Sequence, residues 1–366
     1  MKIKSDGNEL VTRLWDNWHA HFRQGPLLEF LVEIFIQSGW RRRIVAEPNT
    51  QPPKLTGQEA IDYCLGIKDR AAKILHGQEF MPIPVLQITE KTTSEMVLRA
   101  YELGVRVFKV YPFFVTTNSE NGVVDYTKIY PALGALEGKK DVVVQFHAET
   151  PRSEVEGRFK EEAFLGWELS EIVKLFPGLR LTVEHISSAF GISWMKSKRT
   201  EGRPIAASVT IQHLTNTVDD VLGYSKRSGG LVRVHEGFKP HAKDLKDRDA
   251  IRAVVLAGDE GFFCGNDDAW HLKKNKECAG VSCGAANSIA APSLIIQFFE
   301  ENNALHRLEP FVSEFGAEFY GYLLNTETIR FVRKPWQVPT ELVVSGANDT
   351  VVPWRAGEEL QWQIAD

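Results

Sequence analysis

The feature that most constrains the fold is a regular alternation of short apolar runs with amphipathic helical stretches, repeated eight times along the 366 residues. Several apolar runs lack any polar face, which is typical of parallel strands buried on both sides. Strands are expected at 14–21, 43–46, 82–88, 105–111, 141–147, 179–185, 205–213 and 261–267. The helical stretches lie at 27–38, 56–75, 94–103, 126–136, 161–176, after Ser188, and at 247–256 and 293–302. Eight strand–helix units in succession predict an α/β protein of the (β/α)8 TIM-barrel class.

The C-terminal part of the chain does not continue this pattern. A short helix is expected at 308–319, followed by β-type segments at 329–332 and 341–344. We therefore expect residues 1–304 to form the barrel. Residues 305–366 are expected to form a C-terminal appendage packed on it, not a second domain.

Charge and composition argue against several kinds of partner. Lys and Arg total 43 against 48 Asp and Glu, so the net charge of −5 leaves no basic excess for a nucleic-acid backbone. No apolar run has the length that spans a membrane, and the polar first dozen residues do not resemble a signal peptide. The four cysteines are few and scattered, which favours a reducing compartment. We expect a cytoplasmic protein that acts on a small molecule.

Polar side chains stand at the ends of the predicted strands, where a (β/α)8 barrel carries its functional residues. His19 and His21 point to one face of the first strand and could reach the same metal ion, with Arg23 next along that face. The alternative for this pair is a strand edge with two polar side chains. Other candidates end or interrupt later strands: Asn49, Lys109, His147, His185, His213 and Asp267. Four of these histidines, His19, His21, His147 and His185, together with one aspartate suggest a pair of metal sites.

Lys109 is unusual because it lies between Phe108 and Val110 inside an apolar strand. Burial of an ammonium ion is costly and lowers its pKa until the amine is neutral. A neutral amine can react with carbon dioxide to form a carbamate, an anionic group with two oxygens that could bridge two metal ions. The alternatives are a lysine that snorkels to the barrel rim or one that pairs with a carboxylate.

The segments around these residues carry a resemblance to a known family. They are 16–25, 47–53, 108–112, 116–119, 146–149, 183–186, 212–214 and 265–271. In this order they resemble the dihydroorotases of the amidohydrolase superfamily, in particular the short, monofunctional bacterial type. The resemblance covers the whole predicted barrel, and the motifs are specific as a set.

The resemblance implies a binuclear zinc site. His19, His21, Lys109 and Asp267 would hold one Zn²⁺, and Lys109, His147 and His185 the other, with Lys109 carboxylated on its side-chain nitrogen and a hydroxide bridging the ions. Two cations acidify the shared water and polarise an amide carbonyl, and Asp267 would carry the proton to the leaving nitrogen. The implied reaction is the reversible cyclisation of N-carbamoyl-L-aspartate to L-dihydroorotate in pyrimidine biosynthesis.

The substrate of that family also carries a free carboxylate. Arg23 suits it, because a guanidinium offers a planar fork of donors. The resemblance adds further residues to the pocket: Asn49, Thr116, Thr117, His271 and the backbones of Leu214 and Ala286. It also implies that loop 113–122 closes over the substrate. From the residues alone, Asn49 could be a turn residue, His271 a surface histidine, and the loop an ordinary mobile one.

The sequence departs from the family pattern on the substrate side. Asp268 adds a second carboxylate beside Asp267, and Trp270 replaces a usual proline. The segment after Pro240 is shorter than usual, and 278–292 is longer. These departures leave open a related cyclic-amide hydrolase with another ring substrate. A non-catalytic dihydroorotase-like assembly partner ranks lower, since every ligand position is filled, and a homodimer is implied only by analogy.

Overall fold

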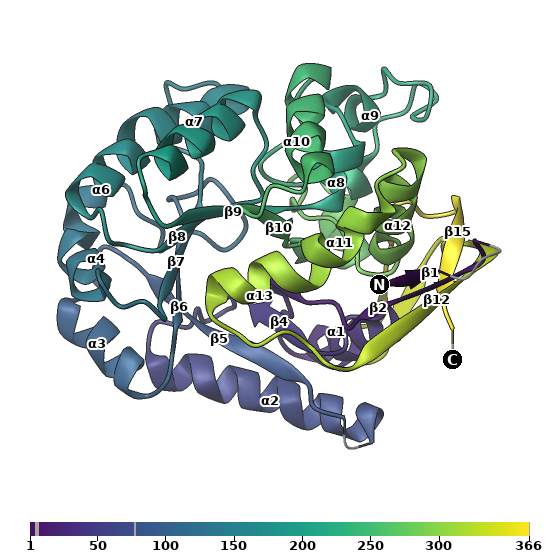
Figure 1. Ribbon diagram of the computed structural model, residues 1–366, viewed down its shortest axis with the longest axis horizontal. Helices are drawn as coiled ribbons and strands as arrows, with labels where there is room; N and C mark the ends of the chain where they lie inside the picture. Colours follow the sequence, from purple (N-terminus) through teal and green to yellow (C-terminus); the bar gives the residue numbers. More distant parts are fainter. Residues whose placement is uncertain (4–6, 77, 366) are drawn as a thin grey trace.

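The predicted alternation forms a curved sheet of parallel strands surrounded by helices in the computed structural model, which describes residues 1–3, 7–76 and 78–365 (Figure 1). The sheet order is β10-β9-β8-β7-β6-β5-β4-β3-β11. Its strands are β3 (Asn17–His21), β4 (Arg43–Ala46), β5 (Met81–Ile88), β6 (Val107–Val110), β7 (Val143–His147), β8 (Leu181–Glu184), β9 (Ile205–Val209), β10 (Phe262–Cys264) and β11 (Asp268–Ala269).

The eighth predicted run closes the barrel with two short pieces. β10 pairs in parallel with β9, whereas β11 pairs in parallel with β3, with Asp268 opposite Ala20. Between the two pieces, the Gly265 N–H donates to the Val209 carbonyl and the Asp267 N–H donates to the His19 carbonyl. One run therefore connects the seventh strand to the first, and the predicted (β/α)8 class is confirmed.

Helices cover the outside of this sheet (Figure 1). The larger ones are α1 (Pro26–Gln37), α2 (Gly57–Leu75), α3 (Ser94–Glu102), α4 (Tyr130–Leu136), α7 (Ala189–Thr200), α10 (Leu245–Ala257) and α12 (Ala291–Glu301). Shorter ones are η1 (Tyr126–Ile129), η2 (Gly157–Phe159), α5 (Lys160–Phe164), η3 (Leu165–Leu169), α6 (Ser170–Leu175), α8 (Ile211–Thr215), α9 (Val218–Leu222), η4 (Val234–Glu236), α11 (Lys273–Lys276), η5 (Leu305–Arg307), η6 (Pro310–Glu314) and α13 (Phe315–Tyr320). Thr56 caps α2 as expected, in a reciprocal capping box with Glu59. Across the described residues, no helix is at once long and apolar enough to cross a bilayer.

The seventh strand is shorter than the sequence predicts. It ends at Val209, and the Thr210 side chain accepts a hydrogen bond from the His213 N–H, which starts α8. His213 therefore lies in a helix, not at a strand end. The first barrel strand also begins later than predicted, at Asn17, and it is preceded by a separate strand, β2 (Glu9–Arg13).

A second sheet joins the two ends of the chain (Figure 1). Its order is β1-β2-β12-β15, from β1 (Lys2–Ile3), β2, β12 (Thr328–Gln337) and β15 (Glu359–Ile364), and its pairings are antiparallel. β13 (Leu342–Val344) and β14 (Asp349–Val351) form a separate pair. This sheet takes strands from both sides of residue 305, and the division of the chain there stays a prediction.

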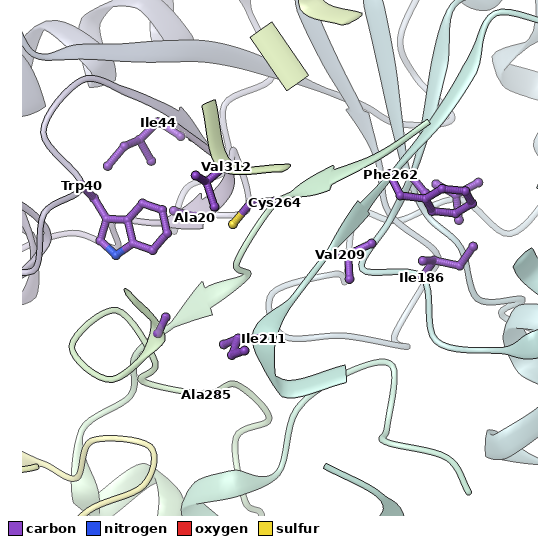
Figure 2. Close-up of a cluster of buried hydrophobic side chains, with 14 of the residues drawn as sticks. Ala20, Trp40, Ile44, Ile186, Val209, Ile211, Phe262, Cys264, Ala285 and Val312 are labelled. Atoms are coloured by element: carbon purple, nitrogen blue, oxygen red, sulfur yellow. The ribbon is translucent and has the colours of Figure 1, made fainter. Parts of the chain in front are cut away.

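Apolar side chains fill two layers of the barrel. The larger layer lies between the strands and the helices, and Figure 2 shows part of it around Ala20, Ile44, Val209 and Phe262. The smaller layer lies inside the barrel and joins residues of seven strands to α13: Trp18, Val45, Ile83, Val85, Val107, Val143, Ala206, Phe263, Ala317 and Tyr320. Trp18 stacks on Tyr320 with ring centroids 4.4 Å apart, so α13 covers this end of the interior.

Gly316 is required where α13 meets Trp18. A Cβ atom at this position would lie 2.0 Å from Trp18 Nε1. We expect Gly316→Ala to lower the free energy of unfolding by about 1–3 kcal/mol, because a buried indole must move. Denaturant unfolding followed by circular dichroism measures this change. Gly157→Ala is the matched control, since a Cβ there meets nothing within 4 Å, and an equal loss in both variants would contradict the packing argument.

Candidate active site

A layer of polar side chains lies inside the barrel beyond the apolar floor. Side chains alternate along a strand, so Lys109 shares the inner face of β6 with Val107, and Gln145 and His147 share that of β7 with Val143. Lys109 is fully buried, and His147 is 2% exposed. Lys109 is thus a barrel-interior residue and does not snorkel to the rim.

An irregularity in β3 brings both predicted histidines of the first strand to this layer. The register with β4 shifts between Asn17 and Ala20. Trp18 can therefore join the apolar floor while the neighbouring His19 joins the polar layer, with His21 two residues further along. Such bulges commonly redirect side chains beside functional sites.

His19, His21 and Asp267 form a compact donor set. Asp267 Oδ1 lies 3.1 Å from His21 Nε2 and 3.4 Å from His19 Nε2. Asp267 has a φ of 47°, a left-handed conformation that is uncommon outside glycine but that aspartate adopts more readily than most residues. The three side chains are buried, and their ligand atoms lie close enough together to hold a metal ion.

His147 and His185 lie next to this set. The His185 ring centroid is 4.6 Å from that of His147 and 5.1 Å from that of His19. The structure thus brings together the predicted ligands of both metals, and five of the six line one cavity: His19, His21, His147, His185 and Asp267. The sixth, Lys109, lies outside the cavity lining, and its Nζ is 3.1 Å from Glu47 Oε2.

The electrostatics of the site suit a divalent cation. Burial lowers the pKa of His21 to about 3, with a smaller contribution from Arg23, and burial lowers the pKa of His19 and of His185 well below the usual value. The imidazoles are therefore neutral, which is the form that binds metals. His185 Nδ1 is buried and lacks a hydrogen-bond partner among the described residues, a costly arrangement that ligation would relieve. Lys109 Nζ has an ion-pair contact with Glu47 but no well-aligned hydrogen bond among those residues. The donor set fits a metal centre.

Several ligands are oriented by polar partners, of which Glu184 and Glu149 were not among the residues predicted from the sequence. Glu184 Oε2 lies 2.5 Å from His19 Nδ1, and Glu149 Oε2 lies 2.7 Å from His147 Nε2. Asn49 Oδ1 lies 2.7 Å from His21 Nδ1. Such partners fix the ring orientation of metal-binding histidines. The sequence could have indicated Glu184 and Glu149 by their proximity to predicted ligands, because Glu184 precedes His185 and Glu149 follows His147 by two residues.

Asp267 and Asp268 have separate environments. Burial raises the pKa of Asp267 to about 7, although Lys109 and His147 oppose the shift. Asp268 accepts hydrogen bonds from Asn17, Asn266 and Ser288, away from the histidines. The extra carboxylate therefore has a structural set of partners, and Asp267 is the aspartate at the candidate metal site.

Arg23 lines the cavity and has no carboxylate partner in the described part of the chain. Its Nε donates to the Trp270 carbonyl at 3.1 Å, and its Nη2 lies 3.1 Å from His271 Nε2. Among the described residues no carboxylate lies within ion-pair distance of this guanidinium. His271 is half-buried, and its Nε2 also lies 3.1 Å from the Cys283 carbonyl, so it is not the surface histidine of the alternative interpretation. An uncompensated cation at a cavity of this kind favours an anionic ligand.

Loop 113–122 lies over the cavity in a closed conformation. Thr117 Oγ1 donates to the Cys283 carbonyl at 3.1 Å, and Asn49 Nδ2 donates to the Thr117 carbonyl at 3.0 Å. Thr116 and Thr117 both line the cavity, whose free volume is only about 20 Å³. The loop is thus held to the cavity wall through Thr117.

Three predicted pocket residues, Leu214, His271 and Ala286, are absent from the described lining of the cavity, where Lys239, Cys283 and Gly284 are found instead. His271 lies beside the cavity through its contact with Arg23. The Leu214 N–H donates to Thr210 and its carbonyl accepts from Arg252, while the Ala286 carbonyl accepts from the Trp354 N–H. These backbone groups already have partners within the fold. The sequence feature that could have indicated Lys239 as a cavity residue is its position beside Pro240, in the shortened segment.

Comparisons with known proteins agree with this arrangement. No family model matches the chain. Dihydroorotases of Alcanivorax borkumensis and Marinobacter nauticus are 38% and 35% identical to it, and the alignments cover 95% and 96% of this chain and 97% of each relative. The crystal structure of Saccharomyces cerevisiae dihydroorotase in complex with 5-fluoroorotic acid matches with a TM-score of 0.88 at 28% identity, over 98% of both chains. L-Hydantoinase from Arthrobacter aurescens shares the fold alone, with a TM-score of 0.75 at 15% identity, over 98% of this chain and 83% of that one. The histidine-lined barrel and the full-length similarity place this chain in the dihydroorotase family of cyclic-amide hydrolases.

Proposed function

We propose that the protein is a zinc-dependent dihydroorotase that interconverts N-carbamoyl-L-aspartate and L-dihydroorotate in pyrimidine biosynthesis. The observation that carries this proposal is the convergence of five predicted metal ligands on one cavity that also exposes the unpaired guanidinium of Arg23. A cyclic amide with a carboxylate substituent needs both features. The metal ligands serve the cleavage of the amide bond, and the guanidinium binds the carboxylate.

The residues that would hold the metals are those of the two predicted sets. His19, His21, Asp267 and Lys109 would hold one zinc ion, and Lys109, His147 and His185 the other, with Lys109 carboxylated. When bound, the two ions supply Lewis-acid polarisation of the ring amide and acidify water.

The remaining steps belong to side chains of this chain. Arg23, with His271 beside it, binds the substrate carboxylate and fixes the ring orientation. Asp267 takes a proton from the attacking water and returns it to the departing ring nitrogen. Thr116 and Thr117 exclude bulk water when loop 113–122 is closed, and the loop opens to exchange substrate and product.

The proposal is tested with purified protein of measured zinc content. We expect ring opening of L-dihydroorotate to be at least about 10²-fold more efficient than that of dihydrouracil, which lacks the carboxylate that Arg23 would bind. Liquid chromatography of both reactions measures this ratio. Full zinc occupancy without turnover of L-dihydroorotate would contradict the proposal in favour of another ring substrate, and protein without bound metal would favour a non-catalytic partner. A homodimer in the cytoplasm stays a prediction, which light scattering checks for the oligomeric state.

A further inference from the structure

Glu47 is a buried carboxylate that the proposed mechanism does not use. It follows β4 directly, and its backbone N–H donates to the Ala20 carbonyl at 2.9 Å, so its position is fixed by the neighbouring strand. Its side chain is fully buried. An acid in this place needs a partner inside the barrel, because an unpaired buried charge is costly.

The partners of Glu47 are Lys109 on β6 and Tyr111, which directly follows that strand. Glu47 Oε2 lies 3.1 Å from Lys109 Nζ and accepts a hydrogen bond from the Tyr111 hydroxyl at 2.7 Å. Lys109 Nζ also lies 5.1 Å from the centre of the Tyr111 ring. Among the described residues, Glu47 is the one carboxylate within ion-pair distance of Lys109. The alternative that Lys109 pairs with a carboxylate is therefore realised in this structure.

The contact between Glu47 and Lys109 is compatible with carboxylation of Lys109, and it has a role in the carboxylated state. When the neutral amine of Lys109 attacks carbon dioxide, a nitrogen–carbon bond forms, one carbon–oxygen π bond becomes an anionic oxygen, and one proton leaves to water. The product keeps a single N–H on Nζ. A buried N–H needs an acceptor, and Glu47 Oε2 is already within reach of that nitrogen.

The acceptor also determines where the new group points. A carbamate is planar at nitrogen, so its carboxylate lies on the side away from the N–H. Glu47 holds the N–H, and Tyr111 fixes the orientation of Glu47. The two carbamate oxygens on Lys109 are therefore directed to one place only. The cluster includes His19, whose Nδ1 lies 3.8 Å from Glu47 Oε1.

We propose that Glu47 is the positioning residue for carboxylated Lys109, accepting its remaining N–H and so directing the carboxylate toward the histidine cluster. This inference rests on the proposed function, because it assumes that Lys109 is carboxylated. Glu47 acts through Lys109 and does not touch the substrate: it is absent from the described lining of the cavity.

Two substitutions at position 47 separate the hydrogen bond from the charge and the packing. Glu47→Gln keeps a carbonyl acceptor and the shape of the side chain, whereas Glu47→Leu keeps similar bulk and removes the acceptor. The holoenzyme of each variant is prepared with ¹³C-bicarbonate and zinc. The carbamate carbon is measured by ¹³C NMR, and bound zinc by elemental mass spectrometry.

We expect Glu47→Leu to lower the carbamate signal and the zinc affinity by about 10–100-fold, as loss of an outer-shell partner does. Glu47→Gln should stay within about twofold of the unsubstituted protein. Retention of carbamate and zinc in Glu47→Leu would overturn the proposal, and so would an equal loss in Glu47→Gln, since that variant keeps the acceptor.

A second variant keeps the test decisive if Glu47→Leu fails to fold. Tyr111→Phe removes only the hydroxyl that fixes Glu47, and we expect it to lower the carbamate signal severalfold while the protein stays folded. An unchanged signal there would count against the proposal. The unsubstituted protein tests the proposed function separately. If it carries neither carbamate nor zinc, the proposed metal centre is wrong, independently of the role of Glu47.

Discussion

Lys109→Ala is expected to lose both bound zinc ions and at least about 10³-fold of the ring-opening rate. Lys109 is the one residue assigned to both metals, so its removal weakens the two sites together. Metal ions contribute several kcal/mol to the stabilisation of such transition states, and each 1.36 kcal/mol is a factor of ten in rate. Elemental mass spectrometry and steady-state kinetics on the same preparation measure the two losses.

The burial of Lys109 makes a folding control necessary for this variant. Alanine leaves Glu47 buried without its basic partner, which destabilises the protein independently of zinc. Lys109→Met keeps most of the side-chain volume, and Lys128→Ala removes a surface lysine whose partner is Glu90. We expect Lys109→Met to behave as Lys109→Ala and Lys128→Ala to behave as the unsubstituted protein. A folded Lys109→Met variant that retains two zinc ions would refute the carbamate bridge.

The barrel was predictable because its evidence is local. Parallel strands buried on both faces are apolar throughout, so runs such as 143–147 are visible without knowledge of their neighbours. The same rule makes an interrupting lysine or histidine conspicuous. Five of the six predicted metal ligands line the cavity for this reason, since each stands at or near the C-terminal end of a strand.

The features that the sequence did not predict depend on contacts between distant segments. The pairing of β2 with β12 joins residues about 320 positions apart, and the sequence of 9–13 gives no sign of its partner. The ion pair of Glu47 with Lys109 is also non-local, as is the contact of Glu184 with His19. His213 was misplaced for a local reason: Thr210 can extend a strand or cap a helix, and the tertiary structure selects the cap.

Arg23→Met is expected to lower kcat/KM for L-dihydroorotate by about 10²–10³-fold without changing the zinc content. The guanidinium lines the cavity, and no described residue offers it a carboxylate partner. Two charge-assisted hydrogen bonds to a substrate carboxylate contribute about 3–5 kcal/mol. Arg23→Lys should recover only part of this loss, because an ammonium cannot form the bidentate contact.

Substitution of Arg23 removes its side-chain contacts with the Trp270 carbonyl and His271 but keeps its backbone contact. Its backbone carbonyl accepts from the Tyr63 hydroxyl at 2.8 Å, which any residue at this position preserves. The discriminating measurement is therefore the substrate dependence of the loss. Dihydrouracil lacks the carboxylate, so its slow turnover should be the same in Arg23→Met as in the unsubstituted enzyme. An equal loss for both compounds would mean that Arg23 supports the metal site or the fold. A loss confined to L-dihydroorotate would assign the carboxylate contact to this guanidinium and explain why Arg23 follows the two histidines on the same strand end.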